Sequence, residues 1–338
     1  MRNTEAIAEK FDVNGEQAQA LDFTENTALR ASAGSGKTRV LTKRFVRILL
    51  KETEADLDDI IAITFTRKAA TQMKDRIRRE LAGWLKKPQY ENDLRLAGFR
   101  LRMSEARIDT IHAFLGKLIR QYFQILGIDP GFTVLEEVDT KVLLLRFTEA
   151  SIRAIFDDAS LGKCLNSFMT LYGADLAGTP LRDAVISLYQ GMRCVGDTVK
   201  TVKTRYVEHM ARMTAADTGM SSTQIGVQSA QTEMPSTQAE SISNDGTHSL
   251  EQIGLVLLEQ LDHRFHEYKD RENVLDFSDL EILACDLLER PESCRSIWNS
   301  FRHLMMDEFQ DVNPLQMRIV NLLTVSYTHL TLPTIYSV

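Results

Sequence analysis

A glycine, a lysine and a threonine follow one another near the N-terminus, at the end of the segment ASAGSGKT that runs from Ala31 to Thr38. The segment lies between an apolar run that predicts a strand (27–31) and an amphipathic pattern that predicts a helix (37–50). Its glycines let the backbone bend so that several N–H groups point at one phosphate, and Lys37 can reach the phosphate oxygens. We therefore predict a nucleoside triphosphate site; the alternative is a chance glycine turn at a helix start.

Two carboxylates, Asp307 and Glu308, follow an apolar run at 301–306 that predicts a buried strand. A carboxylate at the end of a strand can hold Mg²⁺ opposite the hydroxyl of Thr38, and its neighbour can polarise an attacking water. An acidic pair in this position is often only a solvated turn, but the phosphate loop upstream favours the catalytic interpretation. The polar side chains that follow, which are placed to sense a γ-phosphate, are Gln310 and Asp311.

The elements that must position these side chains alternate between strands and helices over the first 125 residues. Apolar runs predict strands at 60–65 and 107–111, and helical patterns follow them at 66–84 and 113–126. This alternation is typical of a parallel sheet, so we predict an α/β fold.

A helical region interrupts this pattern before the strand at 301–306. Within it, the segment 213–249 contains no Lys, Arg or aromatic residue, so we interpret it as a flexible linker. We expect a helical insertion at 126–269 and a core formed by 1–125 and 270–324. The helical patterns of the insertion cover 141–156, 181–192 and 250–268.

Charge is distributed unevenly along the 338 residues, which leave room for about two domains. The net charge is −7, yet residues 1–130 hold 23 Lys and Arg against 18 Asp and Glu. A local basic surface for nucleic acid and a merely solvated helix face are equally compatible with this excess. No apolar run approaches the roughly 20 residues that span a bilayer, so we predict a cytoplasmic chain without membrane contact. Four scattered cysteines are interpreted as reduced and structural.

Several blocks of the sequence together resemble the UvrD-like branch of superfamily 1 DNA helicases, closest to its RecB/AddA-type members. They occur in the family's order, and the phosphate loop shares the family's alanine in place of the first glycine. The blocks are NGEQAQAL (14–21), ASAGSGKT (31–38), AITFTRKAATQM (62–73), IDTIHAF (108–114), LDFSDLE (275–281) and MDEFQDVNPLQ (306–316).

The resemblance implies ATP and Mg²⁺ as cofactors and assigns residues to them. Thr38 and Asp307 would hold Mg²⁺, and the catalytic residues would be Lys37, Glu308 and Gln310. Nucleotide-binding residues would be Gln17, which reads the adenine, and Ala31, Ser32, Ala33, Gly34, Ser35, Gly36, Lys37, Thr38 and Arg39.

A second set of residues would contact DNA by the same resemblance. Phe65 would stack under a base, although a phenylalanine at a strand end is often only a core residue. Arg67 stands where the family often has asparagine, which weakens its assignment. The whole set is Thr64, Phe65, Thr66, Arg67, Thr110 and His112.

The resemblance also implies a fold and an activity. The fold would be a P-loop, RecA-like parallel sheet with an α-helical insertion of the 1B type. The activity would be that of an ATP-dependent 3′–5′ DNA helicase or translocase of DNA repair or recombination. Its partners would be single-stranded DNA, junctions of single- and double-stranded DNA, and a second helicase–nuclease subunit.

The family's third motif and second RecA-like domain have no counterpart in this sequence. We therefore expect an N-terminal fragment that is nearly inactive by itself. Two alternatives stay open: a fragment that binds ATP and single-stranded DNA without doing work, and a P-loop ATPase that does not unwind.

The last residues, 325–338, are unlike the family and rich in threonine. Back-translation of VSYTHLTLPT resembles a transposase-based sequencing-library adapter, so we interpret 325–338 as a non-native tail; the alternative is a divergent C-terminus. A sheet without the family's next motif is then expected to lack the strand beside 301–306.

Overall fold

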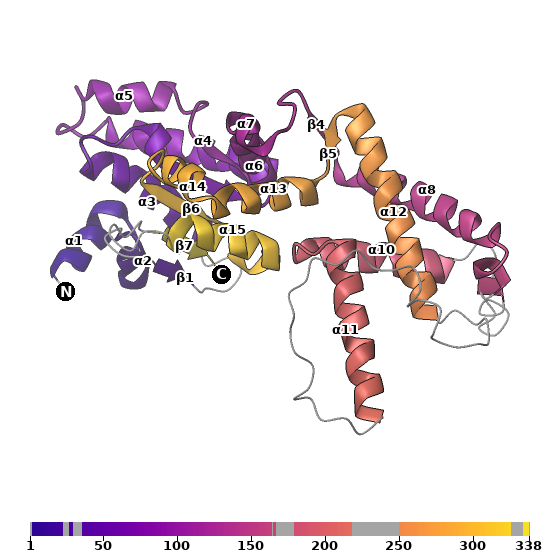
Figure 1. The fold of residues 1–338 in the computed structure, drawn as a ribbon. Coiled ribbons are helices and arrows are strands. Elements are labelled where there is room, and N and C mark those ends of the chain that lie inside the picture. Colours follow the sequence, from indigo (N-terminus) through magenta and orange to yellow (C-terminus); the bar gives the residue numbers. More distant parts are fainter. Residues whose placement is uncertain are drawn as a thin grey trace. The chain divides into compact units, whose positions relative to one another are not determined.

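A computed structural model describes residues 2–22, 27–29, 36–163, 165–166, 179–217, 250–325 and 334–337. Contacts along the chain define two units, which are drawn together in Figure 1. Unit 1 comprises residues 1–131 and 279–338, and unit 2 comprises residues 132–278. Unit 2 is therefore inserted into the sequence of unit 1.

Unit 1 is built on a parallel sheet with the strand order β1-β7-β6-β2-β3. Its strands are short apolar runs, and the buried run IIAIT of β2 is typical because parallel strands are covered on both faces. The bounds are β1 (Thr27–Leu29), β2 (Ile60–Thr64), β3 (Ile108–Thr110), β6 (His303–Met306) and β7 (Thr334–Ser337).

Helices cover both faces of this sheet. Ile60, Ala62 and Met305 belong to one core cluster with the apolar sides of α3, α4 and α5, while the alternate residues Ile61 and Ile63 are buried on the opposite face. The helices of unit 1 are α1 (Arg2–Phe11), α2 (Gly15–Ala20), α3 (Lys37–Lys51), α4 (Arg67–Trp84), α5 (Leu94–Leu101), α6 (Ile111–Gln121), α7 (Phe123–Leu126), α13 (Phe277–Glu289, which crosses the unit boundary), α14 (Pro291–Trp298) and α15 (Pro314–Val325), with 3-10 turns η1 (Leu57–Asp59) and η4 (Phe309–Asp311).

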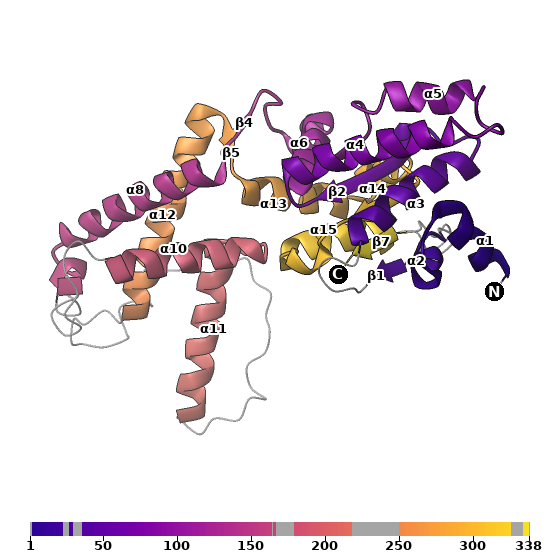
Figure 2. The same ribbon diagram turned by 180° about the vertical axis from the view of Figure 1, so that it is seen from behind.

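Unit 2 consists mainly of helices, which Figure 2 shows from behind. The long helices α8 and α12 pack against each other and against α10, with Leu144, Leu257 and Phe265 in the shared core. The bounds are α8 (Glu137–Phe156), α10 (Thr179–Cys194), α11 (Val199–Asp217) and α12 (Leu250–Glu272), with the two-stranded ladder β4 (Thr133–Val134) and β5 (Val274–Leu275). No helix in the described part of the chain has the length and apolar character needed to cross a membrane.

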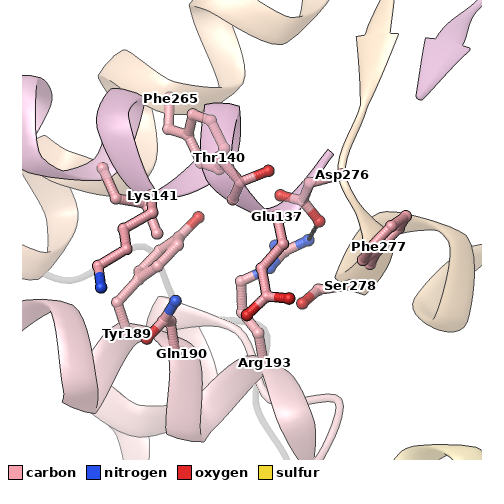
Figure 3. A pocket seen from close by; sticks show the side chains of 11 residues that line it. Glu137, Thr140, Lys141, Tyr189, Gln190, Arg193, Phe265, Asp276, Phe277 and Ser278 are labelled. Carbon is pink, nitrogen blue, oxygen red and sulfur yellow. Dashed lines mark ion pairs between the residues drawn. The ribbon is translucent and has the colours of Figure 1, made fainter. Parts of the chain in front are cut away.

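A polar cluster is buried inside unit 2 beside a cavity of about 150 Å³, shown in Figure 3. The carboxylate of Asp276 lies 3.7 Å from Arg193 and 3.2 Å from Lys269, and all three residues are buried. The Tyr189 hydroxyl donates to Asp262 at 2.9 Å. These contacts join α10 and α12 to the segment after β5, so the cluster fixes the packing of the unit.

Three details of the fold differ from the sequence-based expectations. Helix α11 continues to Asp217, so the linker prediction is wrong for 213–217; its remainder, 218–249, lies outside the described residues. The single helix expected at 113–126 is two helices, because the chain bends at Tyr122, whose φ is −113° and ψ 25°.

The third difference concerns the C-terminal segment. Thr334–Ser337 forms β7 and pairs with both β1 and β6, so the expected absence of a strand beside β6 is wrong. Pairing in a sheet uses backbone groups, and the facing edges of β1 and β6 accept a strand whose side chains carry no family pattern.

Candidate functional site

The site lies at the edge of the sheet where the parallel strands end. The register pairs Ile63 of β2 with Met306 of β6 and Thr64 of β2 with Thr110 of β3, so the residues that follow each strand emerge side by side. The Asp307 amide donates to the Ile63 carbonyl at 2.9 Å and extends this register by one residue. The candidate residues after β2, β3 and β6 thus share one edge of unit 1.

Thr38 and Asp307 meet at this edge. The Thr38 hydroxyl, in the first turn of α3, donates to the Asp307 carboxylate at 3.0 Å, although the two residues are 269 positions apart in the sequence. Asp307 is only 6% exposed. This contact brings together the end of the phosphate-loop segment and the acidic pair, as a nucleotide–metal site requires.

The donor set at this position fits Mg²⁺. A hydroxyl oxygen and a carboxylate oxygen are hard ligands, and Mg²⁺ in nucleotide sites takes one or two protein ligands and completes its shell with phosphate and water. In keeping with this sparse coordination, no group of three or more His, Cys, Asp or Glu side chains that could hold a metal occurs among the described residues. Thr38 and Asp307 would be the protein ligands.

Glu308 adopts an unusual backbone conformation directly after Asp307. Its φ of 56° is left-handed, which costs a residue with a side chain about 1–2 kcal/mol. Its amide donates to the Asp307 carboxylate at 3.1 Å, and its own carboxylate accepts from the side-chain amide of Gln310, which also donates to Asp311 at 3.2 Å. Strain of this kind is concentrated at functional sites, and here it aims the Glu308 side chain.

Gln17 lies close to the N-terminal end of α3. The residue caps α2 reciprocally with Asn14, whose side chain accepts from the Gln17 amide at 2.8 Å. A Cβ built on Gly36 would lie 3.6 Å from Nε2 of Gln17, and Gly36 itself has a φ of 87° that favours glycine. The end of the phosphate-loop segment and the proposed adenine reader are therefore adjacent. Ala31, Ser32, Ala33, Gly34 and Ser35 lie outside the described residues.

Arg39 and Gln17 line the same open groove, which encloses about 720 Å³. The Arg39 guanidinium pairs with the Asp12 carboxylate at 2.6 Å, and both side chains are more than half exposed. The other residues that line the groove are Glu5, Ala8, Glu9, Val13 and Asn14. A groove beside Gln17 is where the predicted base-binding role would place an adenine.

Buried cations on α3 hold the segment that carries Gln17, and sequence reasoning missed them. Arg44 donates to the Ala20 carbonyl at 2.7 Å, Arg47 donates to the Leu21 carbonyl, and Lys43 donates to the Phe11 carbonyl. Burial lowers the pKa of Arg44 to about 10, so it remains a cation at neutral pH. These bonds satisfy the carbonyls at the ends of α1 and α2 and lock both helices onto α3.

The candidate DNA-binding residues differ in exposure and in partners. Thr64 is buried and donates to the Thr66 carbonyl at 3.1 Å. The hydroxyls of Thr66 and Thr110 cap α4 and α6, so they position those helices. Phe65 is 62% exposed and is therefore not a core residue. Arg67, at the first position of α4, is exposed as well.

His112 is held by a residue that sequence reasoning did not assign. Its Nε2 lies 2.9 Å from Oε1 of Glu281, whose side chain is only 4% exposed. Glu281 also accepts hydrogen bonds from the side-chain amides of Asn313 and Gln316. The residues stand in the noted blocks LDFSDLE and MDEFQDVNPLQ, but no spacing rule links the two blocks, so the contact could not be predicted.

Comparison with known proteins agrees with this geometry. The model of the UvrD/REP helicase N-terminal domain matches residues 13–332. The chain belongs to this family. The match covers the phosphate-loop segment, the acidic pair and the strands of the sheet between them.

Curated relatives extend the comparison, and all three cited here are large chains of an ATP-dependent helicase/nuclease. The relative from Ruminiclostridium cellulolyticum is 33% identical over 165 residues, which are 48% of this chain and 13% of that protein. Those from Anoxybacillus flavithermus and Acetivibrio thermocellus are 33% and 31% identical, over 53% and 54% of this chain and 15% and 14% of their own lengths. The chain thus matches a small part of these relatives, which are of the type that the sequence resemblance indicated.

Proposed function

We propose that this chain is the ATP-binding and DNA-contacting part of an ATP-dependent DNA helicase or translocase of repair or recombination. The observation that carries the proposal is the 3.0 Å contact between Thr38 and Asp307, because it joins the two halves of a nucleotide–metal site. The family match and the helicase/nuclease relatives support the same activity. Unit 1 corresponds in this proposal to a RecA-like core, and unit 2 to an insertion of the 1B type.

The residues of the site divide the work of ATP hydrolysis among them. Lys37 binds the phosphates from the first turn of α3, and Thr38 and Asp307 hold Mg²⁺, which offsets phosphate charge when it is bound. Glu308 orients the attacking water and accepts its proton. Gln310 contacts Glu308 and lies in the turn η4, so it can report the state of the γ-phosphate to the protein surface. Gln17 and Arg39 bind the base side of the nucleotide.

Single-stranded DNA is the proposed substrate at the ends of β2 and β3, with 3′–5′ movement and preference for junctions as the family implies. Unwinding by the full-length protein tests this proposal directly. A duplex with a single-stranded 3′ overhang should be separated in the presence of ATP, and a matched duplex with a 5′ overhang should not. Separation of neither duplex, with ATP hydrolysis intact, would favour a P-loop ATPase that does not unwind. A second helicase–nuclease subunit is the proposed partner.

Phe65→Ala is expected to weaken single-stranded DNA binding by about 1–3 kcal/mol, the range for the loss of one base–aromatic stack. The ring is exposed, so its removal should leave the fold intact. Fluorescence anisotropy with a labelled oligothymidine measures the affinity, and thermal unfolding checks the fold. Leu94→Ala is the matched control, because Leu94 is an exposed apolar residue on α5, away from the strand ends. Equal effects of the two variants on DNA affinity would argue against stacking.

We further propose that the chain is the N-terminal part of a longer protein and that 325–338 is a non-native tail. In this proposal the native sequence places a strand of its own between β1 and β6, where β7 pairs here. Sequencing of the intact gene should give different codons after Thr324 and a second RecA-like domain beyond them. Without the arginines of that domain, which are worth roughly 10³–10⁵ in rate, this chain alone should hydrolyse ATP at close to the background rate.

A further inference from the structure

The carboxylate of Glu281 joins two parts of the site that are far apart in the sequence. Its Oε1 accepts from Nε2 of His112 at 2.9 Å and from Nε2 of Gln316 at 2.6 Å, and its Oε2 accepts from Nδ2 of Asn313 at 3.0 Å. Glu281 is 3% exposed, so these bonds form away from water. A buried charge with three donors is strongly fixed, because loss of any partner leaves a group unsatisfied.

The first of these donors lies on the DNA side of the proposed site. His112 is the second residue of α6 and follows closely after β3. Thr110, paired in register with Thr64, caps the same helix. A ligand that contacts the ends of β2 and β3 therefore contacts the segment that carries His112.

The other two donors lie on the nucleotide side. Asn313 and Gln316 form a reciprocal cap at the start of α15, since the Gln316 amide donates to Oδ1 of Asn313 at 2.7 Å and the Asn313 amide lies 3.3 Å from Oε1 of Gln316. Their oxygens are used in the cap, and their NH₂ groups both turn to Glu281. The cap begins shortly after η4, the turn that follows Glu308 and contains Gln310.

The chemistry of the contact fixes which groups carry hydrogens. Burial acts to raise the pKa of Glu281, but the hydrogen bonds from His112, Asn313 and Gln316 outweigh it and hold the pKa below its ordinary value. The carboxylate is therefore ionised near neutral pH and can only accept. Nε2 of His112 must accordingly carry a hydrogen, which sets the orientation of its ring.

We propose that Glu281 is a positioning residue that couples DNA binding at His112 to nucleotide binding beside Glu308. The inference rests on the proposed function and adds to it a residue through which the two ligands communicate. DNA that shifts His112 pulls on a carboxylate that also holds the start of α15, and therefore the turn that carries Gln310. Coupling of this kind is reciprocal, so nucleotide binding must alter DNA affinity by the same factor.

The test measures that factor directly in this chain. Calorimetry gives the affinity for a non-hydrolysable ATP analogue with Mg²⁺, without and with saturating oligothymidine, in the parent and in Glu281→Gln. We expect DNA to change the affinity of the parent about 5-fold or more, within the usual range of coupling. In Glu281→Gln the factor should fall to within about twofold of one, because an amide presents a donor where three donors already point. Affinities for each ligand alone should change much less than the factor.

Asp286→Asn is the matched control. Asp286 lies on the same helix, α13, and pairs with Arg290 at the surface, so the variant removes a carboxylate of α13 without touching the three donors. It should retain the factor of the parent. Asn313→Ala, which removes a single donor, is the second test variant, and it decides the matter if Glu281→Gln does not unfold cooperatively in circular dichroism.

The outcomes separate the two levels of the proposal. If the parent binds neither the analogue nor the oligonucleotide, the proposed function fails and this inference fails with it. If the parent binds both without coupling, or if a folded Glu281→Gln or Asn313→Ala keeps the full factor, the coupling role of Glu281 is overturned while the proposed function stands. Equal losses in the variants and in Asp286→Asn would likewise overturn it.

Discussion

Replacement of Lys37 by alanine is expected to abolish nucleotide binding by this chain. Lys37 opens α3 directly after Gly36 and directly before Thr38, whose hydroxyl contacts Asp307. At this position its ammonium group would donate to two phosphates, and each charge-assisted hydrogen bond is worth about 1.5–3 kcal/mol. Because about 1.4 kcal/mol corresponds to a tenfold change in affinity, the loss of two such bonds weakens binding by roughly two to four orders of magnitude.

Calorimetric titration with a non-hydrolysable ATP analogue and Mg²⁺ checks this expectation. Lys51→Ala is the control, since Lys51 is the exposed last residue of the same helix and lies at the end away from the site. The control should bind like the parent, and both variants should unfold like it. Unchanged affinity in Lys37→Ala would remove the basis for assigning a phosphate site to this segment.

The sheet could be predicted from the sequence because its strands are short buried runs with local signatures. The run at 60–65 became β2 (Ile60–Thr64), and the run at 301–306 became β6 (His303–Met306). Parallel order followed from the helical patterns between the runs, and the acidic pair at the end of β6 gave the edge of the sheet that carries the site. In each case the information lies within about ten neighbouring residues.

Contacts between distant polar side chains could not be predicted in this way. Glu281 reads as one more acidic residue of a helix, and only the packing of α6, α13 and α15 brings its three donors around it. Arg44 reads as part of a basic helix face, yet it is fully buried against the Ala20 carbonyl. Periodicity reports which face of an element is buried, but it does not report which polar group lies on the other side.

One recognisable signature was nevertheless overlooked. Asn14 with Gln17, and Asn313 with Gln316, have the same spacing of a capping asparagine and a glutamine three residues later. The structure has a reciprocal cap at both places, at the starts of α2 and α15. The repeat ties a predicted nucleotide-binding residue, Gln17, to a structural role as well.

Glu308→Gln in the full-length protein is expected to leave ATP binding nearly unchanged and to reduce turnover by about 10²–10⁴-fold, the usual contribution of a general base. Glutamine has almost the same shape and meets the same left-handed backbone at φ 56°, so the variant should be as stable as the parent. What it lacks is the charge that accepts the proton of the attacking water. Gln310 can still donate to the oxygen of the new amide, so the turn η4 should persist.

Single-turnover ATP hydrolysis and equilibrium nucleotide binding, measured side by side, test this separation of binding from chemistry. Asp311→Asn is the control, because Asp311 also accepts from Gln310 but is itself exposed. If Glu308 is the base, Asp311→Asn should retain most of the turnover while Glu308→Gln loses it at full nucleotide occupancy. A parallel loss of binding and turnover in Glu308→Gln would instead assign Glu308 to the architecture of the site, as the partner that aligns Asp307 and Gln310.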